Sequence, residues 1–142
     1  MLWRGDTVLL GGLELDVLHP AGLSGDSNDD SIAVQLTCGT VDVLLTGDAE
    51  AGAEAEMIAA ALIGPVEVEK AGHHGSDTSR ILAFVDATSP DYVVISAGRD
   101  NQFGHPIPEV VARWEASGAG VPVAVAVGVP GSSSGCWMED HS

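Results

Sequence analysis

The chain of 142 residues is 45% hydrophobic, a length and composition typical of one globular domain. It has 5 Lys and Arg residues against 21 Asp and Glu residues, which gives a formal net charge of −16 at pH 7. Such a surface repels phosphate, anionic lipid and nucleic acid, so any role with nucleic acid has to depend on a local site. No apolar run approaches the roughly 18 to 20 residues of a membrane helix, and we expect no signal peptide.

Strand and helix patterns alternate along the chain. Alternating apolar residues on both sides of Gly11-Gly12 predict one or two short strands, and "SIAVQLTCGTVDVLLTGD" predicts a hairpin that turns at "CGT". A run rich in Ala and Glu then predicts a helix that Gly64-Pro65 stops. In full, we expect strands near residues 13–18, 32–38, 41–46, 66–70, 91–96 and 122–127, and helices near residues 50–62, 79–86 and 107–117.

This order of elements predicts an α/β layered fold with a mainly β-sheet core. We expect a single domain over residues 1–128, because the sequence contains no linker, internal repeat or second pattern of elements. Residues 129–142 are rich in Gly and Ser and predict a loose C-terminal tail.

Residues with useful chemistry gather where three predicted strands end. "LLTGD" ends with Asp48, "EKAGHH" ends with His73 and His74, and "ISAGRDNQFGHP" contains Asn101 and His105. Because adjacent strands of one sheet lead to the same edge, we expect these side chains to lie close together. Carboxylate oxygens and neutral imidazole nitrogens are ligands of zinc, manganese and iron, so the grouping indicates a metal site.

Each of these residues alone also has a structural explanation. Asp48 precedes a predicted helix and is a natural N-cap. Paired histidines in a loop are more often solvated or hydrogen-bonded than bound to a metal, and "GHP" before a helix is ordinary turn chemistry. Taken singly the residues favour the structural interpretation, and only their combination is specific.

Five segments carry that combination in order: "GDTVLLGGLELDVLHP", "NDDSIAVQL", "VDVLLTGDAEAGAE", "VEVEKAGHHGSDTS" and "PDYVVISAGRDNQFGHPIPEVVARWEASG". Over about residues 5 to 120 they resemble the second half of the metallo-β-lactamase-fold domain at the C-terminus of the ComEC family of competence proteins. That family takes up DNA across bacterial membranes and is located in the bacterial inner membrane. The resemblance implies the C-terminal half of an αββα sandwich and leaves the localisation of this chain open.

The resemblance also implies roles for individual residues. Asp48 matches the aspartate that bridges two metal ions, and either His73 or His74 matches the late histidine ligand of a dinuclear site. Asn101 and His105 match positions at the same rim, where we expect them to orient a phosphodiester or help protonate a leaving group, as catalytic residues. The implied cofactor is a divalent metal, zinc or manganese, and DNA is a partner by resemblance only.

The sequence lacks the early "HxHxDH" motif that supplies most metal ligands in this fold. We therefore expect an incomplete ligand set, a chain that is inactive alone, and an inner sheet face lined by residues such as Val43, Leu45, Val94 and Ile95. A missing N-terminal half or self-association would cover that face. The alternatives are a non-catalytic truncated remnant or partner-binding fragment, and half of a metallo-hydrolase acting on another phosphoester.

Overall fold

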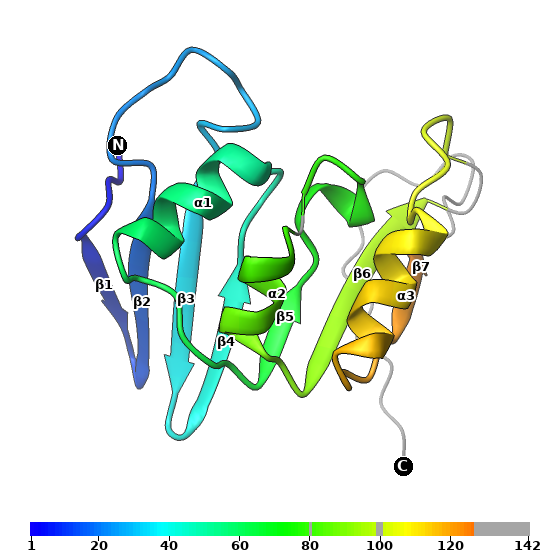
Figure 1. Ribbon diagram of the computed structural model, residues 1–142. Coiled ribbons are helices and arrows are strands. Elements are labelled where there is room, and N and C mark those ends of the chain that lie inside the picture. Colours follow the sequence, from blue (N-terminus) through cyan, green and yellow to red (C-terminus); the bar gives the residue numbers. More distant parts are fainter. Residues whose placement is uncertain (80, 99–100, 127–142) are drawn as a thin grey trace, which may run out of the picture.

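The computed structural model describes residues 1–79, 81–98 and 101–126 and consists of one sheet with helices on one side (Figure 1). Its seven strands lie side by side in chain order. The elements are β1 (Thr7–Leu10), β2 (Leu13–His19), β3 (Ala33–Cys38), β4 (Val41–Leu45), α1 (Ala51–Ala59), β5 (Val68–Lys70), the single 3₁₀ turn η1 (Gly72–Gly75), α2 (Leu82–Thr88), β6 (Tyr92–Gly98), α3 (Pro108–Ala116) and β7 (Val123–Ala126).

The strand pairing changes from antiparallel to parallel halfway across the sheet. The pairs β1–β2, β2–β3 and β3–β4 are antiparallel, whereas β4–β5, β5–β6 and β6–β7 are parallel. Each parallel step is connected through one of the helices α1, α2 and α3. Because all three crossovers step in the same direction across the sheet and share one hand, their helices lie on the same face, as Figure 1 shows.

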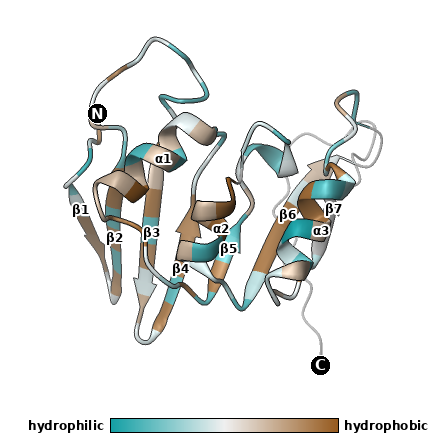
Figure 2. Cartoon of the chain, in the orientation of Figure 1, coloured by the Kyte–Doolittle hydropathy of each residue, from teal (hydrophilic) through white to brown (hydrophobic). Residues whose placement is uncertain are grey.

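The core lies between this sheet and the three helices. Phe84 of α2 and Met57 of α1 pack with Leu44 of β4, and Trp114 of α3 packs with Val93 of β6 in a second cluster. All five side chains are buried. Figure 2 shows hydrophobic residues on β4 and β6, the strands that lie under the helices.

The opposite face of the sheet is apolar as well, although no helix in the described part of the chain covers it. Directly paired residues share a face, and two rows of pairs run across the strands on this side. The solvent-accessible apolar residues of the two rows, here called the open face, are Val8, Leu15, Val34, Leu36, Val43, Leu45, Val68, Tyr92 and Val94, whereas Val17, which pairs with Val34, is buried. All residues of the open face retain some solvent exposure.

The prediction that Ile95 shares this face with Val94 is wrong. Ile95 is fully buried in the cluster that contains Trp114, beneath the helices. Successive side chains of a strand point to opposite faces, so two adjacent residues cannot line the same one. Val43, Leu45 and Val94 do lie together on the open face.

The predicted elements agree with the structure, apart from some of their ends. The first pattern forms two strands, β1 and β2, which turn at Gly11, where φ is +62°. The helix expected over residues 50–62 ends at Ala59 instead, because Ala61 adopts a left-handed conformation with φ 54°. That turn directs Leu62 and Ile63 against the core. The predicted tail, residues 129–142, and the last residue of the strand expected over 122–127 lie outside the described residues.

Two further elements begin later than expected. The strand expected from residue 66 begins at Val68, and the helix expected from residue 79 begins at Leu82. Before this helix, the Ser79 hydroxyl donates to the Ser76 carbonyl, and Ile81 N donates to Glu54 Oε2 at 2.8 Å. These bonds fix Ser76, Ser79 and Ile81 ahead of α2. Among the described residues, no helix combines the length and the apolar character needed to cross a membrane.

Candidate functional site at the carboxyl edge of the sheet

The three loops that carry the predicted site residues meet at one edge of the sheet. They follow β4, β5 and β6, which are parallel neighbours and therefore end at the same edge. The backbone joins the loops: His73 N donates to Gly47 O at 3.0 Å, and Ile107 N donates to Gly75 O at 3.0 Å. The fold thus brings the loops of Asp48, the paired histidines and His105 together.

The paired histidines adopt an unusual backbone conformation. His73 has φ 44° and ψ 41°, and His74 has φ 53° and ψ 23°, so both lie in the left-handed region. This region disfavours residues with a Cβ atom by roughly 1–2 kcal/mol each. A strained backbone of this kind persists only where the surrounding structure holds it in place, and it is common at functional sites. Here it turns the backbone sharply after β5 and places both imidazole rings on one short turn.

His74 and Asp48 face each other across two strand ends. His74 Nε2 lies 3.7 Å from Asp48 Oδ1, and both side chains are about half exposed. The other ring nitrogen, Nδ1, lies 2.8 Å from Ser96 O, a carbonyl that can only accept a hydrogen bond. In the neutral ring Nδ1 therefore carries the proton, and Nε2 presents its lone pair on the side of Asp48.

The alternative that Asp48 caps the following helix is wrong. The N-cap residue of α1 is Glu50, and no side chain makes a capping hydrogen bond there. Asp48 instead receives support through its backbone, because Asp48 N donates to Ser31 Oγ at 3.2 Å. Its carboxylate remains available to a ligand on the rim.

Glu50 is a site residue that the sequence reasoning missed. Its Oε1 atom lies 3.2 Å from His73 Nδ1 and accepts hydrogen bonds from Thr78 Oγ1 at 3.1 Å and Asn28 Nδ2 at 3.0 Å. Its only signal in the sequence is a second carboxylate two positions after Asp48 in "GDAE", at the first residue of the predicted helix. That position is ordinary for a residue in the first turn of a helix, so the pattern does not distinguish it.

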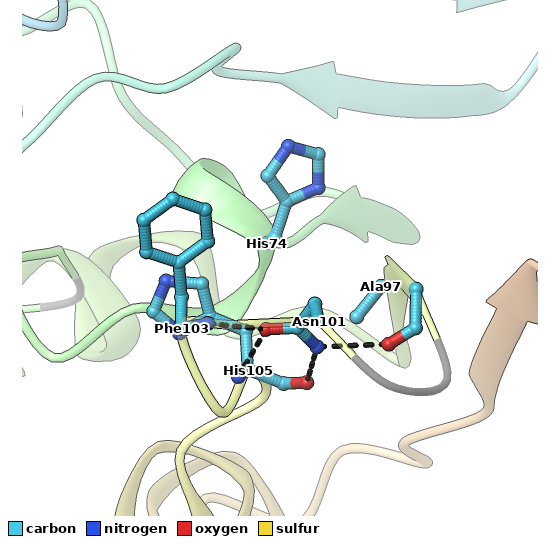
Figure 3. A pocket seen from close by; sticks show the side chains of 6 residues that line it. His74, Ala97, Asn101, Phe103 and His105 are labelled. Atoms are coloured by element: carbon cyan, nitrogen blue, oxygen red, sulfur yellow. Dashed lines mark hydrogen bonds between the residues drawn. The ribbon is translucent and has the colours of Figure 1, made fainter.

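Asn101 holds the third loop in shape (Figure 3). Its Oδ1 atom accepts hydrogen bonds from Phe103 N at 3.2 Å and His105 N at 2.9 Å, and its Nδ2 atom donates to Gly98 O and His105 O at 2.8 and 2.6 Å. These four bonds join the two ends of the loop and fix the backbone of His105. Direct contact between Asn101 and a phosphodiester stays a prediction.

A pocket of about 230 Å³ lies beside this loop. Its lining comprises His74, Ala97, Gly98, Asn101, Phe103 and His105. Figure 3 shows the ring of Phe103 at the pocket with that of His105; the two rings stack at a centroid distance of 5.8 Å and an interplanar angle of 16°. The His105 ring also meets His73 edge to face, at a centroid distance of 5.8 Å.

The environment of His105 favours its neutral form. Its Nδ1 atom is buried without a hydrogen-bond partner among the described residues. Burial first, and then the positive charges of His73 and His74, hold the pKa of His105 below its ordinary value of 6.5, while Asp77 acts in the opposite direction. At neutral pH this imidazole is therefore able to accept a proton.

The described residues fit a metal ion only in part. Two donors about 2.0 to 2.2 Å from one tetrahedral zinc ion lie about 3.3 to 3.6 Å apart. The pair of His74 Nε2 and Asp48 Oδ1, at 3.7 Å, is close to that spacing. However, no group of three or more His, Cys, Asp and Glu side chains with the geometry of a metal site occurs in the described part of the chain. The edge supplies two suitable donors but not a complete ligand set.

The fold defines the class of this protein. A solved structure of a mutant of the β-hydroxylase CmlA, which has a metallo-β-lactamase fold, superposes with a TM-score of 0.54 at 15% identity, covering 85% of this chain and 31% of that one. The sheet with helices on one face is one α/β layer, the C-terminal half, of that αββα sandwich. No family model matches the sequence.

Several curated proteins are similar in sequence. ComE operon protein 3 of Bacillus subtilis is 33% identical over 109 residues, covering 76% of this chain and 14% of the relative. Recombination protein 2 of Haemophilus influenzae is 37% identical over 103 residues, covering 72% of this chain and 13% of the relative. Competence protein ComA of Neisseria gonorrhoeae is 33% identical over 120 residues, covering 82% of this chain and 16% of the relative. The chain belongs to the ComEC-like family of competence proteins and spans about one sixth or less of these relatives' length.

Proposed function

We propose that this chain forms one side of the metal site of a metal-dependent phosphodiesterase that acts on DNA. The observation that carries the proposal is the pair of Asp48 Oδ1 and His74 Nε2, which face each other at 3.7 Å. In the neutral ring both atoms are hydrogen-bond acceptors, so nothing in the pair itself joins them. A divalent cation between them satisfies both.

The proposed cofactor is zinc or manganese, held by Asp48 and His74, with His73 as a further candidate ligand. When bound, such an ion supplies Lewis acidity toward a phosphoryl oxygen. Because a catalytic zinc ion normally has three protein ligands, the remaining donors have to come from another segment or chain. We expect the isolated chain to bind the ion weakly and to be inactive.

His105 and Asn101 complete the proposed site from the chain's own residues. His105 lies on the wall of the pocket, and its lowered pKa leaves the ring neutral at pH 7, so it is suited to accept a proton from a group at the rim. Asn101 acts as a positioning residue, because both functional groups of its side chain are bonded to backbone atoms of the His105 loop. A shift of this loop would move His105 relative to the substrate.

DNA is proposed as the substrate because of the proteins to which this chain is similar. Two of the similar proteins are named for competence and recombination. The proposed metal ion at the local site is suited to bind a phosphodiester oxygen. The net charge of −16 opposes binding of a polyanion elsewhere on the surface. The proposed DNA contact is therefore confined to the edge of the sheet.

The proposed partner is the N-terminal half of the same fold, packed on the open face. Nine apolar side chains of this face retain solvent exposure, and an apolar patch of this kind is typical of a surface that binds a partner. The N-terminal half would supply the "HxHxDH" ligands along with the packing surface. Self-association through the same face is the competing outcome.

The test is metal-dependent hydrolysis by the chain with and without an N-terminal half carrying "HxHxDH", co-expressed as a separate polypeptide. Calorimetry measures binding of Mn²⁺ or Zn²⁺, and a chromogenic phosphodiester and a short DNA strand serve as substrates. We expect the pair of polypeptides to bind metal and cleave both, Asp48→Asn to abolish cleavage, and Asp77→Asn to leave metal affinity nearly unchanged.

Three results would contradict all or part of the proposal. A stable pair that binds no metal and cleaves neither substrate would support the non-catalytic remnant. Cleavage of the chromogenic phosphodiester but not of DNA would support another phosphoester as the substrate. Metal-dependent cleavage by the chain alone, lost in Asp48→Asn, would show that the missing ligands are not required.

A further inference from the structure

We infer that Glu50 is a positioning residue that fixes His73 as the Nδ1–H tautomer, so that His73, like His74, presents an unprotonated Nε2 atom at the site. This inference rests on the proposed function for its purpose, but it concerns the chain's own residues. Its central measurement needs neither metal nor activity.

Three side-chain atoms converge on one oxygen of Glu50. Asn28 Nδ2, Thr78 Oγ1 and His73 Nδ1 lie 3.0, 3.1 and 3.2 Å from Glu50 Oε1. They come from the loop before β3 and from the turn after β5, so the carboxylate joins segments that are distant in sequence. The Glu50 side chain does not cap its own helix, and its 29% exposure leaves it largely enclosed by these partners.

The protons of this network can be assigned one by one. A carboxylate only accepts, so the single hydroxyl proton of Thr78 is directed to Glu50. Ser76 Oγ, 3.0 Å from Thr78 Oγ1, is then the donor of that pair. Thr78 Oγ1 also lies 3.3 Å from His73 Nδ1, and with its proton already used it can only accept there.

Both neighbours of His73 Nδ1 are therefore acceptors, so the proton of the neutral ring has to reside on Nδ1. The same logic applies to His74, whose Nδ1 atom faces the Ser96 carbonyl. The two adjacent rings thus reach the same protonation pattern through different partners, one a carboxylate and one a backbone carbonyl. Their Nε2 lone pairs are left for the site.

This arrangement is what a metal-binding or proton-accepting imidazole requires. Partners on the second ring nitrogen fix the tautomer and the orientation of such a ring. Removing such a partner typically lowers metal affinity about 10–100-fold. A purely structural role for Glu50 would instead predict lower stability with no change in the His73 tautomer.

The test is a long-range ¹H–¹⁵N correlation spectrum of the uniformly ¹⁵N-labelled full chain at about pH 8.5, where free imidazole is neutral. In the unmodified protein we expect both His73 and His74 as Nδ1–H tautomers. In Glu50→Leu the Thr78 hydroxyl is released to donate to His73 Nδ1, so His73 should become mainly the Nε2–H tautomer. His74 should not change, and its resonance reports that the turn is still folded.

Two further variants sharpen the test. Glu50→Gln retains an acceptor oxygen and should keep the Nδ1–H tautomer, whereas Glu115→Leu, the same substitution at an exposed position of α3, should leave both histidines unchanged. In the chain paired with an N-terminal half, Glu50→Leu should weaken Mn²⁺ binding about 10–100-fold.

The inference is overturned if His73 is the Nε2–H tautomer in the unmodified protein, a result that does not require any variant to fold. It is also overturned if His73 stays Nδ1–H in Glu50→Leu while His74 is unchanged. Failure of the proposed function has a different signature: the tautomers follow expectation, but the paired chains bind no metal.

Discussion

Gly75 and Pro106 are in such close contact that no side chain fits between them. A Cβ atom added to Gly75 would lie 2.9 Å from Pro106 Cβ, and Gly75 has φ +82°. This contact joins the turn of the paired histidines to the loop of His105. The relative position of His74 and His105 on the pocket wall therefore depends on a glycine that makes no chemical contribution of its own.

Gly75→Ala should destabilise the protein by two additive causes. The left-handed conformation costs roughly 1–2 kcal/mol for a residue with a Cβ atom, and overpacking against Pro106 adds roughly 1–3 kcal/mol. Gly118 offers a matched control, because it has φ +95° but open space around its Cβ position. Chemical denaturation should show a larger loss for Gly75→Ala than for Gly118→Ala. Equal losses would show that the contact with Pro106 is unimportant.

The pKa of His105 gives a prediction on pH dependence. Because burial lowers it in the folded chain, the unfolded chain binds more protons in the window just below 6.5. Stability should therefore rise with pH through this window and level off above it, and His105→Phe should flatten the rise. NMR titration of the metal-free chain should place the His105 midpoint below 6.5.

Asp77 provides an internal check on this assignment, because its charge raises the pKa of His105. Asp77→Asn should move the His105 midpoint further down. A midpoint that moves up, or that starts above 6.5 in the unmodified chain, would contradict the proposed environment of the ring.

Val93 and Val94 allow the two faces of the sheet to be compared with one substitution. Val93 is fully buried beneath the helices, whereas Val94 lies on the open face. Val93→Thr should cost about 1–3 kcal/mol, because it buries a hydroxyl in an apolar cluster. Val94→Thr should change the stability of the isolated chain less and instead weaken its association with an N-terminal half or with a second copy.

Denaturation and light scattering on the two variants measure these effects separately. If Val94→Thr destabilises the monomer as much as Val93→Thr does, the open face is covered within the chain itself. The comparison thereby tests the proposed partner surface without knowledge of the partner.

The two adjacent histidines should differ in their effect on metal binding. In the chain paired with an N-terminal half, we expect His74→Ala to weaken Zn²⁺ or Mn²⁺ binding more than His73→Ala, because His74 Nε2 lies 3.7 Å from Asp48 Oδ1, whereas His73 Nδ1 contacts Glu50. Isothermal calorimetry of the two variants gives the order directly. The reverse order would assign the ligand role to His73 and leave His74 as a rim residue.

Much of the fold could be predicted because periodicity and turn chemistry agree along the chain. Strands β3 and β4 alternate around "CGT", and Pro108 lies at the start of α3 where a helix tolerates it. The C-terminal end of α1 could not be predicted, because the left-handed turn at Ala61 accompanies the packing of Leu62 and Ile63 against the core. Tertiary packing overrides the high helix propensity of alanine there.

The candidate site was predictable at the level of its loops but not of its contacts. Asp48 and the paired histidines stand at strand ends that sequence patterns locate well. The partners of the imidazoles are different: Ser96 acts through its carbonyl, which every residue has, and Glu50 lies where a helix commonly begins. Such partners are defined only once the backbone is folded.

The chain-order sheet has a consequence for how the molecule can be assembled. Every described strand pairs only with the strands before and after it in the sequence, so no ladder of hydrogen bonds in this sheet needs a strand from outside residues 7–126. Among the described strands only the outer edges of β1 and β7 lack a neighbouring strand, and the open face presents side chains rather than backbone groups to the proposed partner. A metallo-β-lactamase-type sandwich built in this way is suited to fragment complementation, in which two separately synthesised polypeptides dock face to face and reconstitute one centre.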